Sequence, residues 1–170
     1  MEQGLQRDLE QLVRDEASSK SPFLPRDVGL KAAVFADAGF LDPRALRFLD
    51  AISYALPDDA NVVCDMCIPG YWLGGFHRTP APRKLAYPLG WGTLGCAFPQ
   101  GLGAALAGAG PAVSISGDGG FLYACGELAA AKQENIPLTA VIVDDDGYGM
   151  IRYDQDLHGD PREGVDLTNP

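Results

Sequence analysis

Short apolar runs alternate with helical patterns in the second half of the chain. Residues 113–116 (Val-Ser-Ile-Ser) and 138–143 have the length and β-branched composition of buried strands. Residues 122–134, between them, have the pattern of one helix, and Asn135-Ile136-Pro137 ends it before the second strand. A strand–helix–strand crossover makes the two strands parallel.

The upstream half contains further predicted elements. They are a helix over 5–16, a linker-like run over 18–39, a helix that starts at Asp42-Pro43, a strand over 60–66, an irregular segment over 69–88 and a small-residue helix over 95–107. We divide the chain into an N-terminal segment over 1–41 and one domain over 42–170. The predicted fold class is α/β, with a doubly wound, mostly parallel sheet and helices on both faces.

Carboxylates follow both of the predicted parallel strands. Asp118 lies in Gly117-Asp118-Gly119, directly after the first strand, and Asp144-Asp145 follows the second. The carboxyl ends of parallel strands lie at one edge of the sheet, and open α/β sheets bind their ligands there. Carboxylates beside glycine turns suit a divalent cation that holds a phosphate chain.

Composition narrows the classes of partner. The net charge is −10, from 13 basic and 23 acidic residues, which argues against nucleic acid or an anionic membrane surface as a partner. The most apolar stretch, residues 101–116, is too short to span a bilayer and is broken by glycine and proline. The four cysteines come without a secretory leader, so we expect a reduced, cytoplasmic protein.

The acidic motifs resemble those of a known family. Gly117-Asp118-Gly119, a spacer of 24 residues and Asp144-Asp145 are similar to the thiamine diphosphate motif of the pyruvate oxidase and acetolactate synthase family. That motif normally closes with two asparagines where this chain has aspartates. The resemblance extends upstream through residues 87–95 and downstream through Gly149-Met150, and it covers roughly residues 42–170.

The resemblance implies two cofactors, thiamine diphosphate and Mg²⁺, and a set of ligands. Asp118, Asp145 and the backbone carbonyl of Gly147 would hold the metal. The glycines Gly117, Gly119 and Gly120 would bring the backbone close to the diphosphate. An aspartate at 145 keeps an oxygen ligand and adds negative charge, which favours the metal and disfavours binding of the cofactor without it. Asp144 is expected to point elsewhere and to cap a turn.

The remaining cofactor-binding residues are implied by the same resemblance. Leu94 would lie between the two cofactor rings, and Gly92 and Thr93 would flank it. Tyr148, Gly149 and Met150 would line the pocket. Core packing is an alternative explanation for Leu94, Tyr148 and Met150, and a dinucleotide fingerprint over 90–95 is a weak match because no good strand precedes it.

The implied activity is that of an acetolactate synthase-like enzyme that decarboxylates or ligates 2-oxo acids. The catalytic residues are unknown, because the activating glutamate is expected on a separate pyrimidine-binding domain that no segment here resembles. We therefore expect a domain truncated at its C-terminus, from a larger or split enzyme, that is inactive alone. Expected partners are a pyrimidine-binding domain or subunit, copies of the chain in a homo-oligomer, and a 2-oxo acid.

Two other functions are weighed against this one. A non-catalytic subunit would keep the fold without turnover. A receiver-type phosphoacceptor module would need a lysine after a late strand. It is disfavoured because all four lysines precede the strand that ends before Asp144.

Zinc or redox work by Cys64 and Cys67 is disfavoured because no second ligand pair exists. His77 and His158 lack catalytic partners in sequence, and His158 is expected in a mobile tail.

Overall fold

The computed structural model describes residues 43–77, 79 and 81–169. The chain divides into two compact units, residues 1–53 and 54–170. The helix predicted over 5–16 and the linker predicted over 18–39 lie outside the described residues. Helix α3 (Pro43–Ala55) begins where Asp42-Pro43 predicts a helix start. The predicted domain boundary at residue 42 stays a prediction.

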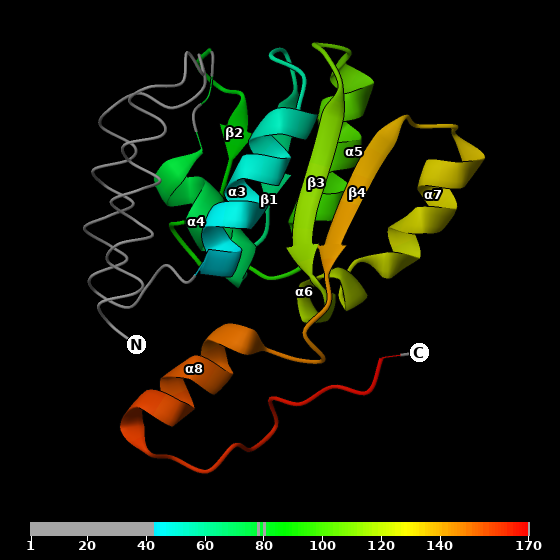
Figure 1. Cartoon of the computed structure of the whole chain (residues 1–170). Helices are drawn as coiled ribbons and strands as arrows, with labels where there is room; N and C mark the ends of the chain where they lie inside the picture. The colour runs from blue at the N-terminus through cyan, green and yellow to red at the C-terminus, as the bar shows by residue number, and fades with distance from the viewer. Residues whose placement is uncertain (1–42, 78, 80, 170) are drawn as a thin grey trace, which may run out of the picture. The chain divides into compact units, whose positions relative to one another are not determined.

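A parallel sheet of four strands forms the centre of the second unit (Figure 1). The strands are β1 (Asn61–Cys64), β2 (Leu85–Ala86), β3 (Ala112–Gly117) and β4 (Leu138–Val143), in the spatial order β2-β1-β3-β4. All three neighbouring pairs are parallel. The predicted α/β class with a parallel sheet is confirmed, and β4 has the predicted bounds. The prediction that β4 is buried was wrong, because β4 lies at an edge of the described sheet and none of its residues is buried.

The strand order contains a reversal between β1 and β3. The chain moves from β1 to β2 in one direction and then returns across β1 to β3 and β4. Right-handed crossovers with this order place α4 (Ile68–Phe76) on one face, and α5 (Ala97–Ala107) on the other. Such a reversal opens a crevice at the carboxyl ends of the strands, where α/β proteins bind ligands.

Helix α5 packs closely against the sheet because its residues are small. A β-carbon on Gly101 would lie 3.1 Å from Cβ of Ser114 on β3 and 3.0 Å from a methyl group of Leu138 on β4. Phe98 of α5 meets Phe121 edge-on, with ring centroids 5.4 Å apart. The small-residue helix predicted over 95–107 is therefore confirmed, with its first two residues in a preceding turn.

The segment over 69–88 is more regular than predicted. It contains α4 and β2, so the irregular segment was wrong. Two glycines of this segment are contact positions: a β-carbon on Gly74 would lie 2.9 Å from the ring of Tyr87, and one on Gly70 would lie 2.1 Å from the carbonyl oxygen of Asp65. Close packing, and not a turn, selects glycine at these two positions.

Two other predictions need correction. The crossover between β3 and β4 is not one helix over 122–134: α6 (Asp118–Leu122), a 3₁₀ turn η1 (Cys125–Glu127) and α7 (Leu128–Gln133) follow one another. Gly126 lies within the 3₁₀ turn, and glycine weakens a continuous helix. His158 does not lie in a mobile tail but ends α8 (Gly149–His158), which stops at the left-handed Gly159 (φ 72°).

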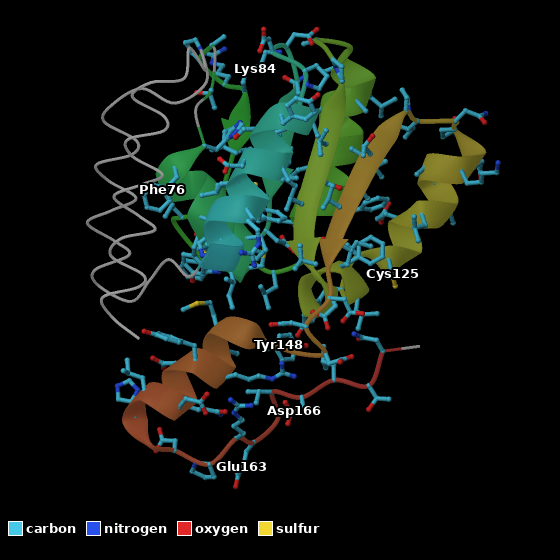
Figure 2. All side chains as sticks on the ribbon, viewed as in Figure 1. Phe76, Lys84, Cys125, Tyr148, Glu163 and Asp166 are labelled. Carbon is cyan, nitrogen blue, oxygen red and sulfur yellow. The ribbon has the colours of Figure 1, made fainter. Side chains whose placement is uncertain are left out.

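Lys84 ties together the amino-terminal edge of the sheet. Its ammonium group donates to the carbonyl oxygen of Asp59 (2.7 Å), to that of Ala109 (2.8 Å) and to the side chain of Asn61 (3.2 Å). Figure 2 shows Lys84 at the edge opposite to Tyr148 and Asp166. Within the described residues, no helix is long and apolar enough to cross a bilayer.

Candidate cofactor and metal site

Asp118 is the centre of the candidate site. It follows β3 directly, as the first residue of α6, and it is only 5% exposed. Its Oδ2 atom accepts hydrogen bonds from the backbone amide of Gly147 (2.9 Å) and from the side-chain amide of Asn169 (2.8 Å). Its Oδ1 atom is buried and has no hydrogen-bond partner among the described residues. One carboxylate oxygen is therefore fixed by the protein, and the other is left for an electropositive ligand.

The environment of Asp118 favours its ionised form. Burial opposes ionisation, but hydrogen bonds from Asn169 and from the backbone amides of Gly119 and Gly147 outweigh burial. The pKa of Asp118 is consequently lower than that of an ordinary aspartate. A negative carboxylate at neutral pH is the form that a divalent cation requires.

Asp144 is joined to Asp118 through one amide. Asn169 Nδ2 donates both to Asp118 Oδ2 and to Asp144 Oδ1, each at 2.8 Å. The same Asp144 oxygen also accepts a hydrogen bond from the backbone amide of Asp146 at 3.1 Å. Asp146 itself has a left-handed backbone angle (φ 56°). Asp144 thus caps the turn, as predicted, while the link through Asn169 was not anticipated.

Asp145 lies beside Asp118 and is harder to ionise. Burial raises its pKa first, the negative charge of Asp118 raises it further, and Arg152 opposes both effects. A β-carbon on Gly149 would lie 2.3 Å from Oδ2 of Asp145, so the carboxylate occupies space that only glycine leaves open. The structure therefore brings Asp118 and Asp145 together, at the edge that the strand pattern predicts.

Arg152 clamps the loop that carries Asp145. Its guanidinium group donates to the carbonyl oxygen of Asp145 (2.6 Å), to that of Asp146, and to the carboxylate of Asp166 (2.8 Å). A β-carbon on Gly147 would collide with Arg152 Nη2, at 2.2 Å. The compact loop therefore depends on a glycine at 147, where the metal-binding carbonyl is predicted.

The segment after α8 returns to the same loop. The backbone amide of Tyr148 donates to the carbonyl oxygen of Val165 (2.8 Å), and the backbone amide of Leu167 donates to the carbonyl oxygen of Asp146 (2.8 Å). Figure 2 shows Tyr148 and Asp166 below the sheet, where β4 ends and this segment passes. This return brings Asn169 to Asp118, 51 residues away in sequence. Sequence reasoning missed Asn169 and Arg152, because no local pattern marks a residue that acts across such a distance.

The glycines after Asp118 are required by packing within the protein. A β-carbon on Gly119 would lie 2.7 Å from the ring of Tyr148, and one on Gly120 would lie 2.4 Å from Oδ2 of Asp65. The hydroxyl of Tyr148 lies 3.3 Å from that of Tyr123. Packing within the protein therefore explains why glycine occupies positions 119 and 120. The predicted approach of these residues to a diphosphate stays a prediction.

Asp65 is a second buried carboxylate that sequence reasoning did not select. It follows β1 and is completely buried. It accepts hydrogen bonds from the backbone amides of Gly95, Cys96 and Ala97, at 2.9–3.0 Å, and from the thiol of Cys96 at 3.2 Å. The available signal was its place directly after a buried strand, which Asp118 shares.

The residues predicted to hold the cofactor rings lie just before this contact. Gly92 and Thr93 are exposed, and Leu94 is half-buried. Gly92 and Gly95 both have left-handed backbone angles, with φ of 66° and 79°. The segment thus bends twice around Leu94 before α5 begins, and the predicted role of Leu94 between the rings stays a prediction.

The cysteine pair flanks Asp65, and the backbone amide of Cys67 donates to the carbonyl oxygen of Asp65 at 3.0 Å. His77 is half-buried and directly follows α4, and its buried Nδ1 atom has no hydrogen-bond partner among the described residues. His158 Nδ1 lies 2.8 Å from the carbonyl oxygen of Asp154 on the same helix. Cys64 and Cys67 are free thiols, and burial raises the pKa of both, to about 12 for Cys67.

The donor set fits a hard cation that brings its own additional ligands. Asp118 Oδ1 and Asn169 Oδ1 are both buried acceptors without a hydrogen-bond partner in the described part of the chain. No group of three or more His, Cys, Asp or Glu side chains that could hold a metal ion occurs in that part. Mg²⁺ commonly binds through one or two carboxylates and completes its shell with phosphate oxygens and water. An incomplete oxygen site is therefore what a metal–diphosphate complex needs.

Comparison with known proteins agrees with this chemistry. The family model described as thiamine pyrophosphate enzyme, C-terminal TPP binding domain, matches residues 67–169. A probable 2-ketoarginine decarboxylase of Pseudomonas aeruginosa is 40% identical over 147 residues, which are 84% of this chain and 26% of that protein. An acetolactate synthase of Bacillus subtilis is 32% identical over 125 residues, 73% of this chain and 22% of that protein.

A sulfoacetaldehyde acetyltransferase of Castellaniella defragrans is a third relative, 30% identical over 120 residues, 70% of this chain and 20% of that protein. The chain spans about a quarter of the length of the first two relatives and a fifth of the third. The cofactor of this domain type is thiamine diphosphate. The chain belongs to the thiamine pyrophosphate enzyme family, and residues 67–169 match its C-terminal, cofactor-binding domain.

Proposed function

We propose that this chain binds thiamine diphosphate through Mg²⁺ and serves an enzyme that acts on 2-oxo acids. The observation that carries the proposal is the state of Asp118: an ionised, buried carboxylate with one oxygen held by Gly147 and Asn169 and the other unpartnered among the described residues. A buried acceptor of this kind is costly unless a donor or a cation meets it. The family's cofactor carries a diphosphate, which Mg²⁺ commonly bridges to carboxylates.

The proposed metal ligands are Asp118, Asp145 and the backbone carbonyl of Gly147. Asp145 supports this role because its carboxylate is destabilised by the charge of Asp118, and a cation between the two would remove that repulsion. Gly147 supports this assignment because its backbone amide donates to Asp118 Oδ2 at 2.9 Å, so the residue lies beside the site. The proposed cofactor contacts are Gly92, Thr93, Leu94, Gly117, Gly119, Gly120, Tyr148, Gly149 and Met150.

The proposed reaction class is decarboxylation or ligation of a 2-oxo acid. Bound thiamine diphosphate supplies a carbanion that adds to a carbonyl carbon and accepts the electrons released with carbon dioxide. The chain's own contribution is to hold the diphosphate end and to orient the rings. Two of the relatives are, by name, a 2-ketoarginine decarboxylase and an acetolactate synthase, and they support both branches of this class.

We further propose that the active site needs a partner. A pyrimidine-binding domain or subunit would supply the activating glutamate, and the enzyme would be a cytoplasmic homo-oligomer. Apolar side chains at the β4 side support association: Ile142 is 42% exposed and Leu128 is 49% exposed. The chain alone is expected to release no carbon dioxide from pyruvate.

Calorimetric titration with thiamine diphosphate, with and without Mg²⁺, tests the proposal. Wild-type protein should bind the cofactor in a Mg²⁺-dependent way, and Asp118→Ala should abolish that dependence because one carboxylate and a carbonyl hold the metal poorly. Asp160→Ala is the matched control, since Asp160 is exposed and follows α8. Unchanged affinity in Asp118→Ala would contradict the assignment.

The alternative of a non-catalytic subunit has its own test. Mixing this chain with a pyrimidine-domain chain, Mg²⁺ and thiamine diphosphate should restore turnover if the proposed enzyme function is correct. Cofactor binding without any turnover in the mixture would favour the non-catalytic alternative. Nothing in the described residues favours the receiver-type module, and the family match argues against it.

A further inference from the structure

Asp65 is buried at the carboxyl ends of β1 and β3, between the turn that precedes α5 and helix α6. It lies at the carboxyl end of β1, next to β3, whose own carboxyl end carries Asp118. Its side chain is completely shielded from solvent. A carboxylate in such a place requires strong hydrogen-bond donors. The protein buries this carboxylate to form contacts with one region of the chain, residues 95–97.

All of the donors come from three consecutive residues. Oδ2 accepts from the backbone amide of Gly95 at 2.9 Å. Oδ1 accepts from the amides of Cys96 (2.9 Å) and Ala97 (3.0 Å), and from the thiol of Cys96 (3.2 Å). Because both oxygens are used, the carboxylate plane fixes the direction of the chain through these residues, and not merely its distance from β1.

The same carboxylate also packs against helix α6. A β-carbon on Gly120 would lie 2.4 Å from Asp65 Oδ2, and one on Gly95 would lie 3.2 Å from the carbonyl oxygen of Gly120. Gly120 follows Asp118 by two residues, in α6. Asp65 therefore sets the spacing between the turn that leads into α5 and the turn that carries the metal-binding carboxylate.

We propose that Asp65 is a positioning residue that holds residues 92–97 in a preformed conformation beside α6. The backbone there is left-handed at Gly92 and Gly95, so it has no regular hydrogen-bonding pattern to maintain its shape. The Asp65 carboxylate supplies that pattern from another strand. A segment that is ordered before the ligand arrives loses less entropy on binding.

The functional consequence rests on the proposed function. If residues 92–94 receive the rings of thiamine diphosphate, the hydrogen bonds that Asp65 accepts from residues 95–97 contribute to affinity for the rings. The packing of Asp65 against Gly120 lies on the diphosphate side, and Asp65→Asn leaves it in place because the two side chains have the same size. A role confined to overall stability would instead weaken every ligand equally. The two possibilities differ in which ligand loses affinity.

Hydrogen exchange on the free, full-length chain tests the positioning role without any ligand. In Asp65→Asn, one oxygen becomes a donor that faces other donors, so at least one of the four hydrogen bonds is lost. We expect the amides of Gly95, Cys96 and Ala97 to exchange at least about tenfold faster, while those in the middle of α5 change little. Leu102→Ala, in the same helix, is the control, because it should accelerate exchange along α5 through lost core packing. Unchanged protection of the three amides, or uniform acceleration, would overturn the proposal.

Wild-type protein provides a measurement that does not depend on the variant folding. The amides of Gly95, Cys96 and Ala97 should exchange about as slowly as those in the middle of α5. The amide of Glu163, which is exposed and lies in irregular structure outside the segment, is the internal reference. Exchange of the three amides as fast as that of Glu163 would overturn the proposal even if Asp65→Asn cannot be purified.

Paired titrations separate this inference from the proposed function. Asp65→Asn should weaken thiamine diphosphate at least about tenfold and leave inorganic pyrophosphate, both with Mg²⁺, within about threefold of wild type. Equal losses for both ligands would overturn a ring-specific role. If wild-type protein binds neither ligand, the proposed function fails, whereas the exchange measurements still decide whether Asp65 positions the segment.

Discussion

Gly120 has no room for a side chain because Oδ2 of Asp65 would lie 2.4 Å from its β-carbon. Asp65 is completely buried, and its oxygens are held by the first turn of α5, so the carboxylate cannot move aside freely. The contact connects the residue that follows β1 with α6, which follows β3. The spacing between these two segments therefore depends on the absence of a side chain at position 120.

Substitution of two glycines by alanine should therefore have opposite effects. Gly120→Ala should lower the free energy of unfolding by about 1–3 kcal/mol, because an overpacked buried position forces its neighbours to shift. Gly103→Ala, in α5 with nothing within 4 Å of the new methyl group, should raise it by about 0.5–1 kcal/mol through helix propensity. Urea unfolding of both variants measures this, and equal effects would contradict the described packing.

Asp145 should tolerate asparagine better than alanine. Asp145→Asn keeps an oxygen ligand, so binding of thiamine diphosphate with Mg²⁺ should stay within about tenfold of wild type, or about 1.4 kcal/mol. Asp145→Ala removes the ligand and should cost considerably more. Calorimetry under identical Mg²⁺ concentrations provides the comparison. If asparagine proves as damaging as alanine, Asp145 does not act through a replaceable oxygen.

His77 should make the protein less stable in mild acid. Burial lowers its pKa below the ordinary value of 6.5, so protonation favours the unfolded chain. The contribution of neutral His77 is present above pH 6.5 and is lost as the pH falls toward the lower folded-state pKa. His77→Gln should therefore flatten the loss of stability between pH 7.5 and 5 relative to wild type. His158→Gln, at an exposed position, is the control, and thermal unfolding across this range that is identical in all three proteins would contradict the prediction.

Lys84 should stabilise the amino-terminal edge without affecting the cofactor. Lys84→Met removes the charged donor shared by Asp59, Asn61 and Ala109, and should cost about 1–3 kcal/mol of unfolding free energy. Lys132→Met, at an exposed position in α7, should change stability by less than about 0.5 kcal/mol. Urea unfolding of the two variants compares them. A loss of cofactor affinity in Lys84→Met would show that the two sheet edges are coupled.

Strands and strand-end carboxylates were predictable because their signals are local. Short runs with β-branched apolar residues identified β3 and β4, and the crossover rule then placed Asp118 and Asp145 at one edge. The family motif that begins at Gly117 reinforced the same conclusion, and the family match bears out the resemblance.

Contacts across the fold could not be predicted in the same way. Asn169 reaches Asp118 only because the chain turns back after α8, and Asp65 reaches Gly95 because α5, which Gly95 precedes, packs against β1. Helix α4 was missed because the sequence alone does not show that Tyr87 packs against Gly74 within it. Local propensity carries no information about which distant side chain arrives at a position.

The bridge from Asn169 to Asp118 and Asp144 also orders events during synthesis. A nascent chain that has been made as far as Val143 contains every strand of the described sheet, yet Asn169 is still 26 positions away. Until then, Asp118 Oδ2 and Asp144 Oδ1 lack the amide that joins them, and the repulsion between neighbouring carboxylates is relieved only by solvent and ions. The ligand site is thus completed by residues that are made after its scaffold, so a chain that ends between these points would contain every strand of the described sheet and lack the amide that joins the two carboxylates.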